Sequence, residues 1–302
     1  MTDPTAGATG PSTPAERERD LWRLLEVYHS VVYFAQERTV HYPALGLKGG
    51  WMGYFATRSA ALGRVPPEVV TACFYNFNHP MVARALPDAW LYTTPEKAYA
   101  ARLRVIDDAM RRLLGGLDEP WLVEAADLAM ELARVVDTAG RPLAAAHTAL
   151  PVPEDPHLRL FWASAVLREY RGDGHTIALT AAGIDGCEAH VLMAALGLVP
   201  ADQRVYRGWS EEDWDAATRR LAERGWVTDD GGITEAGGRV RRDVELVTER
   251  LAHPPFARLG EGPTSRLAAL LTEPVARIVT SGEIVFPNGI GQPPVPELST
   301  VR

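Results

Sequence analysis

The sequence predicts a mainly α-helical protein built from two similar halves. Apolar residues recur at helical spacing along much of the 302-residue chain, most clearly in residues 21–37. A proline-rich stretch, TALPVPEDPH at residues 148–157, reads as a linker between the halves. A chain of this length also exceeds the usual size of one compact domain. We therefore expect two helical domains that are joined near residue 150.

The first half is expected to consist of helices separated by Gly and Pro. Pro66 and Pro67 suit a helix start, where a missing N–H group has no intrahelical partner to lose. After the helix at residues 21–37, apolar periodicity predicts helices at residues 51–62, 66–77, 79–87, 95–114 and 120–136.

The second half has the element order of a winged helix-turn-helix. Helical patterns at residues 160–170, 175–183, 184–197 and 210–225 precede WVTDDGGITEAGGRV, which predicts two short strands about an Asp-Gly-Gly turn. The segment RRDVELVTERLA then predicts another helix. The segments RSAALGRVPPEVV and HTIALTAAGIDGCEA share a weakly similar pattern of helix, short turn and helix, which favours a duplicated unit. The predicted fold is therefore mainly α, a tandem winged-helix-like architecture with a small β-hairpin wing.

These patterns give four expected segments. Residues 1–18 are polar and predict a disordered leader. Residues 19–147 form a degenerate winged-helix-like domain, residues 158–252 form the winged-helix domain, and residues 253–302 form a C-terminal helix followed by a strap or lid.

Charge argues against duplex DNA as a partner. The chain has a net charge of −8, so DNA binding would require a local basic patch. The third helix of the second half would begin at Ser210 and carry Glu211, Glu212 and Asp213 in its first turn. Residues 208–252 contain seven Arg and eleven Asp or Glu, and the wing tip is acidic. We therefore expect no specific duplex binding through this helix and wing.

The segment LREYRGDGH, residues 167–175, concentrates ionisable groups after an apolar run. Gly172 and Gly174 would allow a sharp turn between two helices. One interpretation is an ion-pair network that braces this corner. The other is a pocket, in which His175, Glu169 and Asp173 exchange protons near neutral pH while Arg168 and Arg171 hold an anionic group. The sequence leaves both open.

The first half offers side chains that could face this segment. His29, Tyr33 and Glu37 recur every four residues along one helix. His29 is a further candidate for proton exchange, and Arg58 could position the anionic group in place of Arg168 or Arg171. The candidate ligand contacts in this half are Tyr33, Glu37, Tyr54, Arg58, Tyr75 and Asn76.

Motifs for metals and nucleotide cofactors are absent from the sequence. There is no H-x-x-x-H, no phosphate-binding G-x-x-x-x-G-K-[ST] and no nucleophile motif. We expect no metal and no cofactor. The two cysteines, Cys73 and Cys187, are typical of small core residues in a reducing cytoplasm. No apolar run is long enough to cross a membrane, and no signal peptide is evident.

Several segments of the sequence resemble known families. The phrase LAERGWVTDDGGITEAG resembles the wing region of MarR-type regulators. From about residue 21 to 291 the chain resembles a family of actinobacterial helix-turn-helix or winged-helix proteins. That resemblance is carried by YHSVVYFAQE, GYFATRSAALG, FYNFNHPMVARALPDAW, LREYRGDGH, RGWSEEDWDAATRRLAERG and FPNGIG. It departs at Tyr170, where the family has His, and near Gly289 and Gln292, where the family has Pro and Leu. The resemblance implies a tandem winged-helix-like fold and no particular reaction.

Three functions remain open from the sequence. The favoured one is a winged-helix scaffold that binds a small organic molecule between its halves and could transform it by metal-free acid–base chemistry, in specialised metabolism or self-resistance. The second is a ligand-responsive, MarR-like transcriptional regulator, dimeric through its terminal helices. The third is a protein-interaction module. An enclosed pocket that contains His175 and His29 would favour the first, a basic groove the second and a solid interior the third.

Overall fold

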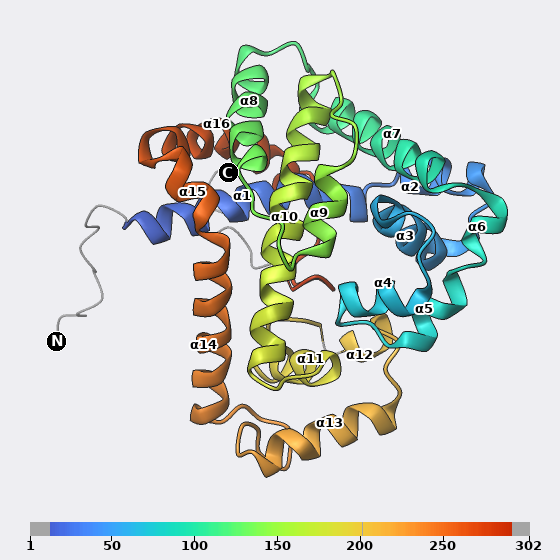
Figure 1. Cartoon of the computed structure of the whole chain (residues 1–302), viewed down its shortest axis with the longest axis vertical. Coiled ribbons are helices and arrows are strands. Elements are labelled where there is room, and N and C mark those ends of the chain that lie inside the picture. The colour runs from blue at the N-terminus through green and yellow to red at the C-terminus, as the bar shows by residue number, and fades with distance from the viewer. Residues whose placement is uncertain (1–12, 201, 292–302) are drawn as a thin grey trace.

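The computed structural model describes residues 13–200 and 202–291 and confirms the mainly helical class (Figure 1). The first half contains α1 (Pro14–Phe34), α2 (Arg38–His41), η1 (Pro43–Leu45), α3 (Gly49–Ser59), η2 (Ala60–Leu62), α4 (Pro67–Phe74), α5 (His79–Ala85), α6 (Ala89–Tyr92), α7 (Pro95–Leu114), α8 (Pro120–Arg134) and α9 (Pro142–Thr148). The remaining helices are α10 (Pro156–Ala181), α11 (Gly186–Ala195), α12 (Gln203–Tyr206), α13 (Glu211–Glu223), α14 (Glu235–Ala252), α15 (Pro254–Leu259) and α16 (Glu261–Thr280).

Local sequence signals set many helix starts. Helices α4, α7 and α8 begin at Pro67, Pro95 and Pro120, where the missing N–H group removes no helical hydrogen bond. Helix α13 follows Ser210 as predicted. The Ser210 hydroxyl accepts from the Asp213 N–H group, and the Asp213 carboxylate accepts in return from the Ser210 N–H group, which completes a capping box.

Helix α10 runs through the middle of the molecule and connects both halves (Figure 1). It packs against α1, α8 and α9 and also lies beside α14. One hydrophobic core contains residues from α1 through the first part of α10, together with α16, and includes Leu167. The second core begins at Ala178 and extends to Val244 in α14. The two cores therefore meet within α10.

The turn predicted inside LREYRGDGH is wrong, because α10 continues through Gly172 and Gly174 without a break. Close packing explains the second glycine. A Cβ atom on Gly174 would lie 2.9 Å from Nη1 of Arg141 and 3.3 Å from Cβ of Leu251. The absence of a side chain therefore lets α14 and Arg141 approach the helix.

The β-hairpin wing is not confirmed in the described residues. The only antiparallel pairing found between α13 and α14 is a single bridge between Val227 and Ile233. Two hydrogen bonds close the acidic turn. The Thr228 N–H group donates to the Gly232 carbonyl, and the Gly231 N–H group donates to the Thr228 carbonyl. The segment is a tight loop with the position of a wing.

The N-terminal end of the chain differs from the prediction of a disordered leader. Helix α1 begins at Pro14, so the last part of the predicted leader, residues 14–18, is helical. Residues 1–12 and 292–302 of the predicted leader and tail lie outside the described residues. In the described tail, Ile284 is buried in the first core and Phe286 packs against it. By length and composition, no single helix among the described residues could cross a membrane, although the bent pair of α10 and α11 passes the same test.

Candidate ligand-binding cavity

A cavity of about 710 Å³ lies where α10 meets α1, α14 and the segments around α4 and α12. Its volume is typical of pockets for small organic molecules. Aromatic side chains of Trp22, Phe74 and Phe77 form apolar parts of its wall. Its charged lining consists of Arg19, Arg23, Arg58, Arg168, Arg171, Arg207, Arg241, Arg242, Glu26, Glu169, Glu245 and Glu249. The lining thus carries an excess of four positive charges in a chain whose net charge is −8.

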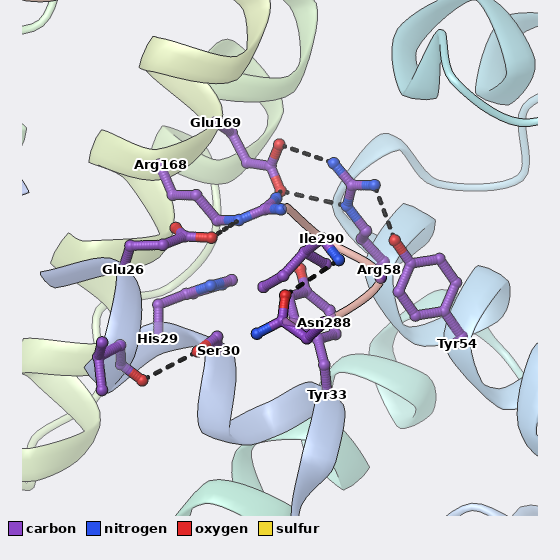
Figure 2. A network of polar contacts seen from close by, with 12 residues as sticks. Glu26, His29, Ser30, Tyr33, Tyr54, Arg58, Arg168, Glu169, Asn288 and Ile290 are labelled. Atoms are coloured by element: carbon purple, nitrogen blue, oxygen red, sulfur yellow. Dashed lines mark hydrogen bonds and ion pairs between the residues drawn. The ribbon is translucent and has the colours of Figure 1, made fainter. Parts of the chain in front are cut away.

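A buried ion-pair network forms one wall of the cavity (Figure 2). The guanidinium of Arg58 binds Glu169 through two hydrogen bonds, with Nη2 3.2 Å from Oε2 and Nε 3.3 Å from Oε1. Arg168 donates from Nη1 to Oε1 of Glu169 at 2.8 Å and from Nε to Oε1 of Glu26 at 3.3 Å. Helices α3, α10 and α1 are thereby joined by two arginines and two glutamates.

The two glutamates differ in their ionisation. Burial would raise the pKa of Glu169, but the guanidinium groups of Arg58 and Arg168 outweigh burial and hold this pKa well below its usual range. Burial also acts on Glu26, and there the single close partner, Arg168, only partly offsets it, so the pKa of Glu26 is raised. Oε2 of Glu26 is buried and has no hydrogen-bond partner among the described residues.

Tyr54 projects into the same positive environment. Its hydroxyl accepts from Nη1 of Arg58 at 3.0 Å. Burial would raise the pKa of Tyr54, but the positive charges of Arg58, Arg207 and Arg168 together lower it. The phenol therefore contributes a polarised hydroxyl to the cavity wall.

His175 lines the cavity as a neutral hydrogen-bond acceptor. The Thr248 hydroxyl donates its only proton to the Val244 carbonyl at 2.8 Å, so it accepts from Nδ1 of His175 at 2.9 Å. Nε2 is then the unprotonated nitrogen. Burial lowers the pKa of His175 to about 4, because the opposing charge of Glu245 does not compensate for it. The imidazole is therefore neutral at neutral pH and a weak base there.

The other predicted contacts that line the cavity are Tyr75, Asn76 and Arg171. Tyr75 ends α4 with a φ of 53°, a conformation rarely adopted by residues other than glycine, and its hydroxyl donates to the Ile184 carbonyl at 2.5 Å. Arg171 pairs with Glu245 and stacks 4.0 Å from the ring of Trp22. The polar cluster of LREYRGDGH thus forms ion pairs and lines a cavity at the same time.

Four of the predicted site residues do not line this cavity. His29 is fully buried, stacks on Phe161 and accepts at Nε2 from Arg102 at 3.3 Å. The Tyr33 hydroxyl also accepts from Arg102, at 3.1 Å. Glu37 pairs with Arg112 near the surface, and Asp173 accepts from the Ala144 N–H group at 2.9 Å. The positions of His29 and Tyr33 beside the network are visible in Figure 2.

The sequence prediction missed three buried polar residues of the lining, Glu26, His190 and Arg207. His190 lies inside the apolar pattern of α11, so it resembled a core position. Arg207 follows the short helix α12 and precedes a glycine with φ of 76°. Arg207 begins the string RGWSEEDWDAATRRLAERG, but nothing in that string indicates a binding site, and only the fold brings these residues to the cavity.

Two arginines near the C-terminal end of α13 are already paired with acids. Arg220 donates to Asp185 at 2.6 Å and to Glu188 at 2.7 Å, and Arg224 also pairs with Glu188 at 2.6 Å. These pairs join α13 to the start of α11. They also reduce the positive charge that this helix could offer to phosphate groups.

The fold and the cavity define a mainly helical protein with an arginine-rich pocket. The chain belongs to the helix-turn-helix family, whose model matches residues 18–285. Neither the curated proteins nor the solved structures contain a match. Family membership establishes the type of scaffold and leaves the ligand to be argued from the site.

Proposed function

We propose that the protein is a cytoplasmic helix-turn-helix scaffold that binds a small organic molecule in the cavity between its halves. The observation that carries this proposal is the 710 Å³ cavity, which combines aromatic walls with convergent arginine, tyrosine and histidine side chains. Such a mixture of apolar surface and a few fixed polar groups is typical of small-molecule sites. A pure interaction module is expected to have a solid interior, and the presence of this cavity argues against that function.

Binding fits the cavity better than acid–base catalysis does. The histidine that lines the cavity beside α14, His175, has a pKa of about 4 and cannot take and return protons efficiently near neutral pH. Asp173 has a pKa raised by burial to about 6, but its carboxylate binds the Ala144 N–H group and does not line the cavity. The neutral Nε2 of His175 is instead suited to accept a hydrogen bond from a ligand.

Native mass spectrometry after incubation with a bacterial metabolite extract tests the proposal. The wild-type protein should retain a small molecule, and Thr176→Trp should abolish retention because Thr176 lines the cavity. The matched control is Ile177→Trp on the same helix, where the side chain is 41% exposed. Retention of nothing by the wild type, or equal retention by both variants, would refute binding in this cavity.

A second candidate function, a MarR-like ligand-responsive regulator, is favoured by the family match and by the α11–α13 unit. The acidic first turn of α13 and the pairing of Arg220 and Arg224 argue against it. Titration of the protein with its own upstream duplex DNA at 50 and 200 mM salt distinguishes the two. We expect no specific binding, whereas tight binding that weakens steeply with salt would favour the regulator.

A further inference from the structure

We infer that the cavity takes an ionised organic carboxylic acid and that Arg207 is the residue that binds its carboxylate. This inference rests on the proposed function and specifies the class of ligand. It assigns the anion to a different residue from Arg58, Arg168 or Arg171, which the sequence favoured.

The first argument is the distribution of charge among the arginines. Arg58 and Arg168 share Glu169 and Glu26, so their charges are balanced inside the network. Arg171 is likewise paired with a glutamate. Among the described residues, no carboxylate lies within ion-pair distance of Arg207, although its side chain is almost completely buried. A buried charge without a counter-ion is unfavourable, and an anionic ligand would supply that counter-ion.

The second argument is that Arg207 is held in place before any ligand binds. Its N–H group donates to the Gln203 carbonyl at 3.1 Å, and its carbonyl accepts from the Asn78 N–H group at 2.9 Å. The side chain donates from Nη2 to the Gly289 carbonyl and lies 4.3 Å from the ring of Phe77. Nε of Arg207 has no hydrogen-bond partner in the part of the chain that the structure describes. The guanidinium is thus oriented with an unused donor.

The third argument is a second unused donor, on His190 in the lining of the same cavity. Nε2 of Gln203 donates to the Gly289 carbonyl at 2.8 Å, which fixes the orientation of this amide. The same nitrogen lies 3.5 Å from Nδ1 of His190, so Nδ1 accepts and neutral His190 carries its proton on Nε2. That Nε2 is buried and has no hydrogen-bond partner within residues 13–200 and 202–291. Nε of the charged Arg207 and Nε2 of His190 are thus both unused donors, and such a pair matches an oxyanion acceptor.

The electrostatic state of Arg207 agrees with this geometry. Burial, together with the positive charges of Arg58 and Arg168, lowers the pKa of Arg207 to about 10, while Tyr54 opposes the shift. A carboxylate beside the guanidinium would favour its charged form. The aromatic rings of Phe74, Phe77 and Tyr54 line the same cavity and suit an aromatic or other apolar body.

Isosteric pairs of acids and amides test the inference. We would measure the binding of benzoate, 2-naphthoate and biphenyl-4-carboxylate, and of the three corresponding amides, by isothermal titration calorimetry. At least one acid should bind the wild type tenfold or more tightly than its amide. Arg207→Gln should remove that preference, because Gln carries no positive charge.

The control variant is Arg219→Gln on the exposed surface of α13, which should bind like the wild type. Thermal unfolding of both variants checks that they are folded, and Arg207→Lys, which keeps the charge, should retain part of the preference. Equal affinity for acid and amide, an undiminished preference in Arg207→Gln, or binding of no acid would overturn the inference. Tighter binding of 2-naphthyl phosphate than of 2-naphthoate would also overturn it, in favour of a phosphate ligand. The extract experiment decides the proposed function separately, since it detects ligands of any charge.

Discussion

Arg58 and Glu169 lie 111 residues apart in the chain, yet Nη2 of the arginine is 3.2 Å from Oε2 of the glutamate. Both side chains are at least nine-tenths buried. The pair joins α3 in the first half to the middle of α10, and Arg168 extends it to Glu26 of α1. The wall of the cavity is therefore also a structural connection between elements far apart in sequence.

Removing the carboxylate of Glu169 should strongly destabilise the protein. Glu169→Gln leaves two buried guanidinium groups with one remaining acid, and loss of one partner of a buried pair typically costs about 3–5 kcal/mol. Urea unfolding at pH 7.5 measures this change. The matched control, Glu124→Gln, breaks the exposed pair with Arg266 and should change stability by less than about 1 kcal/mol. Similar values for the two variants would mean that burial of the network contributes little.

Two glycines of α10 should respond in opposite directions to alanine. Gly174→Ala places a methyl group 2.9 Å from Arg141 and 3.3 Å from Leu251, so we expect a loss of about 1–3 kcal/mol. At Gly172 the nearest atom would be Oε2 of Glu169 at 3.6 Å, an ordinary contact. Gly172→Ala should therefore stabilise the helix by about 0.5–1 kcal/mol. Chemical denaturation of both variants checks the pair, and stabilisation by Gly174→Ala would contradict the packing described here.

His175 should make the protein less stable in mild acid. Its folded-state pKa of about 4 lies below the ordinary value of 6.5, so the stability linked to its neutral form is complete above pH 6.5 and is lost as the pH falls toward 4. Between pH 7.5 and 5.5 this amounts to about 1 kcal/mol. Asp173, with its pKa raised to about 6, acts in the opposite sense, since its contribution is lost as the pH rises through 6.

Comparing the pH dependence of unfolding between the wild type and His175→Asn separates the contribution of the histidine from that of other titrating groups such as Asp173. Asn retains a donor for Thr248 and does not titrate. The wild type should lose about 1 kcal/mol more than the variant between pH 7.5 and 5.5 in urea unfolding. Parallel losses in the two proteins would show that His175 does not have a depressed pKa.

The contact between α11 and the end of α4 depends on Gly186. A Cβ atom there would lie 2.1 Å from the backbone oxygen of Tyr75, which cannot move away as a flexible side chain could. We expect Gly186→Ala to destabilise the protein by about 2 kcal/mol or more and to weaken ligand binding, because Tyr75 lines the cavity. Gly262→Ala in α16, where a Cβ atom would meet nothing within 4 Å, is the control. Differential scanning calorimetry of the two variants measures the effect.

The sequence by itself determined the features that depend on near neighbours. Proline at the starts of α7 and α8 and the capping residues around α13 act within a single helical turn, so their spacing is visible in the chain. The family also follows from strings of consecutive residues. Gly174 of α10 misled the prediction because its role is close packing against other segments, which no local pattern records.

Only the tertiary structure decided which polar residues meet at the cavity. Arg168, Glu169 and His175 line it together, whereas Asp173 lies between them in sequence and binds α9 instead. Successive residues of a helix face different directions, so proximity in sequence does not give proximity in a site. Arg207 begins a string that carries the family resemblance, but nothing in the sequence indicates that it lines a cavity. It is buried without a counter-ion among the described residues, which is the strongest indication for the proposed anionic ligand, and this burial exists only because distant segments fold around it.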